Sequence, residues 1–311
     1  MFRFLLVCLL PLYLFAQQNK PAPKRNELSI TSENDAYLLQ YHDAYYSNGL
    51  FLSLTRATLH KQHKRLLGFE IAQNIYTPVN KNAEPLSAID RPYCGYLYFK
   101  YKQTDFLTKD ALFQWWVSIG VLGDNSGAEA LQNQYHSLFR YKKFSGWKYQ
   151  VPNAVTLNFG VLYAKTLWQP ADNFKIVPLA KANLGTGFVN MGIGTYFCLG
   201  LFEQNQSSAL WHARVSKETN TYKNNHEWFI YALPEWTYQN YNATLQGDRF
   251  FQDAPIAILA QPIEVVFQQT VGLCYAINSI SAKAAWVYQS RETKTQVGTQ
   301  QYLSLQFNYR F

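Results

Sequence analysis

The sequence predicts an all-β protein, a transmembrane antiparallel up-and-down β-barrel of about twelve strands. Hydrophobic residues make up 48% of the 311 residues, yet the mean hydropathy is only -0.24 and charged residues account for only 15%. A soluble protein has more charge and a helical membrane protein is far more apolar, whereas barrel strands combine a lipid-facing side with a polar side. The aromatic share of 17% fits girdles of aromatic side chains at the two membrane interfaces.

Alternation of apolar and polar residues marks the individual strands. It is clearest at residues 303–311, which end on an aromatic residue, as the final strand of outer-membrane barrels does. We expect twelve strands, centred near residues 30, 52, 71, 99, 117, 160, 180, 193, 230, 268, 284 and 306. No linker or shift in composition divides residues 17–311, so a single barrel domain is expected there.

The first sixteen residues have the pattern of a secretory signal peptide. Arg3 precedes a short apolar stretch at residues 4–15, and Ala16 is a suitable cleavage point. The stretch is too short to cross a bilayer as a helix. A lipoprotein alternative rests on Cys8, but this residue lies inside the apolar stretch and follows Val7 rather than a small residue.

Cysteine and charge patterns disfavour a disulfide framework, a zinc site and nucleic-acid binding. Cys94, Cys198 and Cys274 are far apart and show no CxxC spacing, so we expect them to be buried or lipid-facing. The formal net charge of +8 falls to +7 when Arg3 leaves with the signal peptide. The basic residues are dispersed, which fits either anionic lipid head groups or solvated turns.

Residues 126–139 interrupt the strand pattern. The segment is rich in helix formers, and Ser126 and Glu129 have the spacing of a capping box, so we expect a short helix with Ser126 as its N-cap. Both chain ends of such a barrel lie in the periplasm, so the connections 35–46, 77–92 and 123–153 are expected to face the cell exterior. Long connections of this kind commonly carry function.

Polar groups that could carry chemistry are expected at that exterior end. Asn34 and Asp35 follow the first strand, Ser47 begins the second, and His136 lies in the predicted helix. Histidine can accept a proton near neutral pH, and carboxylate and amide oxygens can hold a hard cation. The simpler interpretation is a turn at residues 34–35 and a surface histidine. The remaining histidines fit no motif and are expected at the surface or an interface: His42, His60, His63, His212 and His226.

Five blocks of sequence, in order, resemble one known family. They are SENDAYLLQYHDAYYSNG (32–49), IAQNIYTP (71–78), DRPYCGYLY (90–98), GDNSGAEALQNQYHSLF (123–139) and YNATLQGDRF (241–250). Together they are similar to the motifs of the lipid A 3-O-deacylases, outer-membrane barrels that remove an acyl chain from lipopolysaccharide. The resemblance spans nearly the whole chain after the signal peptide.

The resemblance implies a calcium-dependent hydrolase of an acyl ester of lipid A. The family's catalytic residues fall on Asn34, Asp35, Ser47 and His136, with His136 activating water and Ca²⁺ held near Asn34, Asp35 and Ser47. A substrate-binding lysine of the family falls on Lys81. No GxSxG elbow surrounds Ser47, which favours activated water over an acyl-serine intermediate.

Two departures from the family pattern affect the site. Ser47 replaces a threonine and keeps the hydroxyl, so activity is expected to survive. Before the helix, Asp124 replaces a proline and Ala128 replaces a glycine, and Asp124 could cap the helix or add a metal ligand.

These inferences describe a monomeric enzyme of the bacterial outer membrane, with its site facing the exterior and lipopolysaccharide of the outer leaflet as its partner. Two alternatives remain open. One is an outer-membrane phospholipase, which the parent lipid of the released fatty acid would reveal. The other is a non-catalytic barrel such as a channel, which would conduct ions in planar bilayers without calcium-dependent hydrolysis.

Overall fold

The computed structural model describes residues 23–39, 45–60, 63–81, 85–139, 143–217, 222–250 and 256–311. The predicted signal peptide and His42 lie outside these residues. The strands are β1 (Asn26–Asn34), β2 (Tyr45–His60), β3 (His63–Thr77), β4 (Cys94–Phe106), β5 (Ala111–Leu122), β6 (Ala154–Lys165), β7 (Trp168–Ala171), β8 (Phe174–Gly185), β9 (Phe188–Leu201), β10 (His226–Asn242), β11 (Val265–Ile277), β12 (Ile280–Gln289) and β13 (Gln300–Arg310). The helices are η1 (Asp35–Leu38), η2 (Leu86–Ala88), η3 (Asp124–Ser126), α1 (Ala128–Phe139), η4 (Ser145–Tyr149), η5 (Asn205–Ser207), η6 (Ala209–Trp211) and α2 (Ala243–Gln246), where η marks a 3-10 helix.

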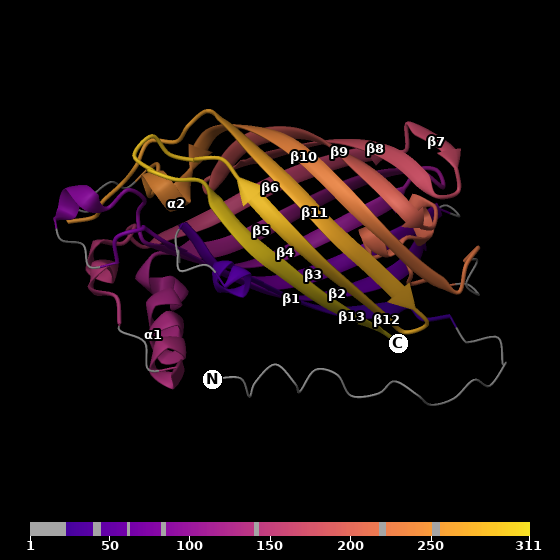
Figure 1. Cartoon of the computed structure of the whole chain (residues 1–311), viewed down its shortest axis with the longest axis horizontal. Coiled ribbons are helices and arrows are strands. Elements are labelled where there is room, and N and C mark those ends of the chain that lie inside the picture. Colours follow the sequence, from indigo (N-terminus) through magenta and orange to yellow (C-terminus); the bar gives the residue numbers. More distant parts are fainter. Residues whose placement is uncertain are drawn as a thin grey trace.

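The described strands form one antiparallel sheet that closes on itself. From β1 to β6 and from β7 to β13 each strand pairs with the next in the chain, and the pairings of β6 with β8 and of β1 with β13 complete the ring. The four-residue β7 only extends a hairpin beside β8 and takes no part in closure. Twelve strands therefore form the wall (Figure 1), and each expected strand centre lies in a different one. The predicted barrel is confirmed.

Side chains on the outer surface of the wall form an apolar band with aromatic residues at its edges. Along β10, Trp228, Ile230, Trp236 and Tyr238 are 43% to 50% exposed. Tyr238 lies ten residues beyond Trp228, which is about 26 Å along the barrel axis at a rise of about 3.4 Å per residue and a tilt of roughly 40°. The apolar band of outer-membrane barrels is about 25 Å tall. Among the described helices, none is both long enough and apolar enough to cross a membrane.

The inner surface of the wall is polar and ion-paired. Glu70 accepts hydrogen bonds from Lys100 Nζ at 2.8 Å and from the Tyr98 hydroxyl at 3.0 Å, and Lys181 Nζ lies 2.5 Å from Glu235 Oε1. A cavity of about 400 Å³ lies beside these side chains, lined by residues of β3 to β9. This contrast between the two surfaces of the wall explains the period-two pattern of the strand sequences.

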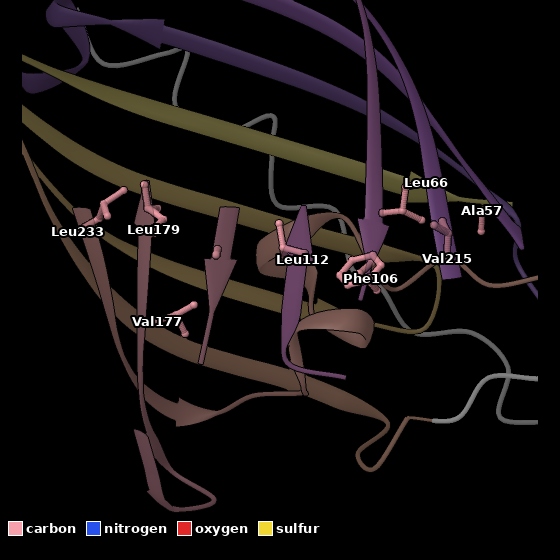
Figure 2. Packing of buried hydrophobic residues seen from close by; sticks show 10 residues of the cluster. Ala57, Leu66, Phe106, Leu112, Val177, Leu179, Val215 and Leu233 are labelled. Carbon is pink, nitrogen blue, oxygen red and sulfur yellow. The ribbon is translucent and has the colours of Figure 1, made fainter. Parts of the chain in front are cut away.

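The connection between β9 and β10 fills the barrel at the end where β13 finishes. Ala213 and Val215 of this connection are fully buried and pack in one cluster with Leu66, Phe106 and Leu112 of the wall (Figure 2). The connection is also bonded to the wall through Lys64 Nζ of β3, which donates to two of its carbonyl oxygens. Apolar side chains of this connection therefore pack inside the barrel at this end.

His212 of the same connection was expected at the surface or an interface, and this expectation is wrong. Its Nδ1 lies 2.7 Å from Oε1 of Glu27, a fully buried residue of β1 that also pairs with Arg310 at 3.1 Å. The buried carboxylate needs these partners because an unpaired charge inside the barrel would be costly.

The opposite end carries the three connections predicted to be functional, now bounded as 35–44, 78–93 and 123–153. The connections 243–264 and 290–299 lie at the same end, and so do α1 and α2 (Figure 1). Cys94, Cys198 and Cys274 are free and buried, as predicted.

α1 begins later than predicted, and Ser126 is not its N-cap. Asp124 begins the separate 3-10 helix η3, after which Gly127 has a left-handed φ of 70°. Ser126 Oγ donates to the Gly123 carbonyl at 2.5 Å, whereas the Gly127 carbonyl accepts the first helical bond, from the Leu131 amide at 3.0 Å. Glycine suits this junction because the left-handed region carries a steric penalty for other residues.

Candidate active site

Asn34 and Asp35 lie at the rim where β1 ends. Alternate residues of β1 face outward, as the 48% exposure of Ile30 indicates, and this alternation places Asn34 on the outer surface of the wall. Asn34 lies opposite Asn48 of β2, and its Oδ1 accepts a hydrogen bond of 2.8 Å from the Ala36 amide. Asn34 thereby caps η1, in whose first turn Asp35 is only 4% exposed.

Ser47 lies in a β-bulge. The pairing of β2 with β3 skips one residue between Tyr46 and Asn48, so Ser47 has no partner of its own on β3. The bulge reverses the alternation of inward and outward side chains along β2. Tyr46 therefore lies on the inner side of the wall, where its hydroxyl donates to Glu33 at 2.6 Å. Tyr45, just before the bulge, has a left-handed φ of 69°, which a tyrosine adopts only when its surroundings hold it there.

The Ser47 hydroxyl belongs to a short chain of hydrogen bonds. Its Oγ lies 2.5 Å from Oγ1 of Thr77, the last residue of β3, and Lys81 Nζ donates to the same Oγ1 at 2.8 Å. Thr77 is fully buried. Two predicted site residues therefore meet at a third that the sequence analysis did not single out, although it belongs to the block IAQNIYTP.

Phe144 connects Lys81 with His136. Lys81 Nζ lies 5.2 Å from the centre of the Phe144 ring, and the His136 ring packs edge-on against Phe144 with 4.6 Å between ring centres. His136 is 7% exposed. Ser47, Lys81 and His136 thus gather around Thr77 and Phe144, and the sequence analysis missed both of these residues.

α1 packs against the outer surface of the wall. Its buried positions, Ala128, Gln132 and His136, recur every four residues and so lie on one side of the helix. Gly95 faces outward in the alternation of β4, and a Cβ added there would lie 2.2 Å from Ala128 Cβ. Gln132 Oε1 accepts a hydrogen bond of 2.8 Å from Trp147 Nε1 of η4. The absence of a side chain at position 95 lets the helix approach the strand closely.

Asp90 ties the β3–β4 connection to the start of β2. Its carboxylate accepts hydrogen bonds from the Tyr45 hydroxyl at 2.6 Å, the Val79 amide at 3.1 Å and the Val297 amide at 3.3 Å. These bonds hold the segment that carries Lys81 beside the bulge that carries Ser47.

Arg91 joins three connections at the same rim. It is fully buried, its Nη2 lies 2.7 Å from Oε1 of Glu292 and donates to Thr244 Oγ1 at 3.1 Å, and its guanidinium lies 4.0 Å from the Tyr76 ring centre. The block DRPYCGYLY therefore supplies a buried frame for the site. The buried ion pair of Arg91 and Glu292, with its additional hydrogen bonds, holds the three connections in one arrangement.

The predicted metal ligands offer oxygen donors only. They are the Asn34 amide, the Asp35 carboxylate and the Ser47 hydroxyl, and the described residues contain no group of three or more His, Cys, Asp and Glu side chains that could hold a metal ion. Ca²⁺ takes roughly six to eight oxygen ligands, which include backbone carbonyls and water. These oxygen donors are of the kind that calcium binds, and a full set of ligands would need backbone, water or substrate oxygens as well.

Comparisons with known proteins identify a family and a similar fold. The family model described as "Outer membrane protein LpxR" matches residues 2–311. The solved structure of LpxR from Salmonella typhimurium is similar with a TM-score of 0.75 and 21% identity, covering 92% of this chain and 100% of that chain. The β-domain of the Bordetella autotransporter BrkA follows with a TM-score of 0.49 and 10% identity, covering 93% and 100%. No curated protein sequence matches the chain.

The Salmonella structure supports the barrel fold, and the family match covers all five sequence blocks from first to last. The resemblance noted in the sequence is confirmed at the level of the family. The chain belongs to the LpxR family of outer-membrane proteins.

Proposed function

We propose that the protein hydrolyses an acyl ester of lipid A, the 3-O-linked one, in the outer leaflet of the outer membrane. The observation that carries this proposal is the convergence of Ser47, Lys81 and His136 on the outer surface of the wall, at the rim of the three long connections. A site on the outer surface meets a membrane lipid from the side. A site in the lumen would require the lipid to leave the bilayer.

The height of the site suits an ester of a membrane lipid. Leu50 is 48% exposed and is the last strongly exposed apolar residue of β2 before the rim. Ser47 lies three residues beyond it, about 10 Å along the strand and about 8 Å along the barrel axis at a tilt of roughly 40°. Acyl esters lie at this boundary between hydrocarbon and head groups.

In the proposed reaction His136 is the general base. Its imidazole takes a proton from a water molecule, whose oxygen attacks the ester carbonyl carbon. The bond between the carbonyl carbon and the sugar's oxygen then breaks, and the proton returns from His136 to this leaving oxygen, which gives a free hydroxyl on the sugar and a fatty acid. General base catalysis of this kind contributes about 10² to 10⁴ in rate. Packing against Phe144 restricts the orientation of the imidazole.

Ser47 and Lys81 would position the substrate and the water. Through their shared bonds to Thr77, the hydroxyl and the ammonium are held at a fixed separation. Lys81 supplies a positive charge for an anionic head group of the lipid, and Ser47 supplies a hydroxyl that can orient water. A bound Ca²⁺ near Asn34, Asp35 and Ser47 would add Lewis-acid polarisation of the ester carbonyl.

The test uses purified protein in detergent, with lipid A and with a diacyl phospholipid, and mass spectrometry of the released fatty acid. Release from lipid A is expected, with a loss of about 10²-fold or more in His136→Ala. The matched control is His226→Ala, because His226 is exposed at the start of β10, at the other end of the barrel. Full activity of His136→Ala would overturn the proposal. Release from phospholipid alone would assign a phospholipase, and no release from either lipid would leave a non-catalytic barrel.

A further inference from the structure

We propose that the flank of α1 formed by Leu131 and Tyr135 is buried in the lipid leaflet, at the boundary between acyl chains and anionic head groups. α1 is then an interfacial helix that holds the site against its substrate layer. This inference depends on the proposed function in one respect, which is the choice of the outer leaflet. The lipid-facing flank itself follows from exposure, helix geometry and the position of α1 on the wall.

Leu131 and Tyr135 are one helical turn apart and lie on the same side of α1. They are 42% and 50% exposed, although both are large and apolar for most of their surface. The wall residues that face lipid have similar exposure, with 48% for Leu50 and 49% for Ile71. On the opposite flank of the helix, Ser137 is an exposed polar residue. The exposed surface of α1 therefore has an apolar flank and a polar flank, as do helices that lie in a membrane interface.

The position of α1 makes this flank continuous with the apolar band of the wall. α1 packs on the outer surface at Gly95 and near Ile75, in the cluster that contains Ala128. Ile75 lies four residues beyond the exposed Ile71, which is about 14 Å along β3 and about 10 Å along the barrel axis at a tilt of roughly 40°. The helix therefore lies just beyond the last lipid-facing residues of this part of the wall.

The direction of α1 agrees with this position. In Figure 1 α1 runs across the long axis of the barrel, beyond the ends of the strands. The barrel axis follows the membrane normal, so a helix across it lies along the membrane surface.

Neighbouring side chains match the same lipid layer. Lys143 and Lys148, which follow α1 in the chain, are exposed and can meet anionic head groups. The Tyr37 hydroxyl lies 2.7 Å from Oγ of Ser32, on the outward-facing side of β1, and Tyr37 is 39% exposed. Tyrosine is enriched at membrane interfaces because it has an apolar ring and a polar tip. A lipid surface therefore suits the flank and its surroundings together.

The first experiment measures depth in vesicles that contain lipopolysaccharide. Single cysteines replace Leu131, Tyr135, Ser137 or Leu50 and carry a nitroxide spin label, while the native cysteines at 94, 198 and 274 are buried. Collisions with oxygen report the bilayer, and collisions with a water-soluble nickel chelate report water. Labels at 131 and 135 are expected to match the reference at 50 and to exceed the control at 137 several-fold in the oxygen-to-nickel ratio. Labels at 131 and 135 that match the control at 137 would overturn the inference.

This depth measurement needs no catalysis, so its failure and a failure of the proposed function are distinguishable. A second experiment tests the consequence with Leu131→Glu and its control Ala130→Glu, because Ala130 is exposed and faces away from this flank. Leu131→Glu is expected to lower the hydrolysis of lipid A in vesicles by about tenfold, because the variant loses the free energy gained when the leucine is buried in lipid. The same variant is expected to keep its activity on lipid A dispersed in detergent. Equal activity on both forms of substrate, at any level, would count against the interfacial role.

Discussion

Gly95→Ala is predicted to abolish most hydrolysis while the barrel stays folded. The added Cβ would lie 2.0 Å from Ser126 Oγ and 2.2 Å from Ala128 Cβ. Carbon atoms in contact are about 3.5 to 4.0 Å apart, so the helix would have to move by more than an ångström. Neither neighbour can yield by a side-chain rotation alone, because Ser126 is bonded to the Gly123 carbonyl and the Ala128 methyl is fixed to the helix backbone.

The magnitude follows from the cost of overpacking. Inserting a methyl into a close-packed contact typically costs about 1 to 3 kcal/mol. If the strain is relieved by separating α1 from the wall, the population of the packed state falls by about 5- to 150-fold. His136 moves with α1, whereas Ser47 and Lys81 stay with the wall. The expected loss in kcat/KM is therefore of the order of 10- to 100-fold.

The assay is the rate of fatty acid release from lipid A, with the heat-dependent shift in gel migration as a measure of barrel folding. The matched control is Gly68→Ala, whose Cβ would meet the flexible Lys102 Cε at 3.2 Å, and its activity is expected to stay near that of the wild type. Adding Ala128→Gly to Gly95→Ala removes one clashing methyl and is expected to restore part of the rate. A folded Gly95→Ala variant with wild-type kcat/KM would show that hydrolysis does not depend on the close contact between α1 and β4.

Three further predictions concern the chain of hydrogen bonds, the buried frame and the metal. Thr77→Val removes the hydroxyl that Ser47 and Lys81 both contact and is expected to lower kcat by about tenfold in steady-state assays, while Thr77→Ser keeps the rate. An unchanged kcat in Thr77→Val would speak against this chain. Glu292→Ala leaves the guanidinium of Arg91 without its ion partner and is expected to lower the free energy of unfolding in urea by about 3 to 5 kcal/mol. The loss is expected to be smaller in Glu292→Gln, and an unaltered unfolding midpoint in Glu292→Ala would disprove this cost. Removal of divalent ions with EDTA is expected to stop hydrolysis, and Ca²⁺ is expected to restore it; hydrolysis that continues in EDTA would remove the metal from the account.

The barrel wall could be predicted because its rule is local. Each wall strand has one lipid-facing side and one polar side, so a period of two appears within the strand itself, as at residues 303–311. The strand β7 was not predicted because all four of its residues are exposed and no alternation marks it. The β9–β10 connection has no period either, because its side chains are buried in the lumen on several sides at once.

Contacts between distant residues set the limit of prediction at the site. The pair of Glu27 and His212 spans 185 positions, and no local pattern identifies it. The bulge at Ser47 is a property of the pairing of β2 with β3 and not of either strand alone. Thr77 and Phe144 matter because they lie between predicted site residues in space, which requires the fold.

The helix start shows a different limit. Ser126 and Glu129 have the spacing of a capping box, yet the left-handed Gly127 and the bond from Ser126 to Gly123 move the start of α1 to Ala128. The close approach of the helix to Gly95 favours this arrangement, because Ser126 and Ala128 both pack there. Tertiary packing thus overrides a valid local signal.

If His136, held on α1 against the outer surface of the wall, drives the removal of one acyl chain from lipid A, then the lipid A of cells must change with this residue. The measurement is mass spectrometry of lipid A from cells that express the wild-type chain or His136→Ala at equal levels. We expect a lipid A species lighter by one acyl chain with the wild type and intact lipid A with the variant. Identical lipid A in both strains, or the same loss of an acyl chain in both, would disprove this role of His136.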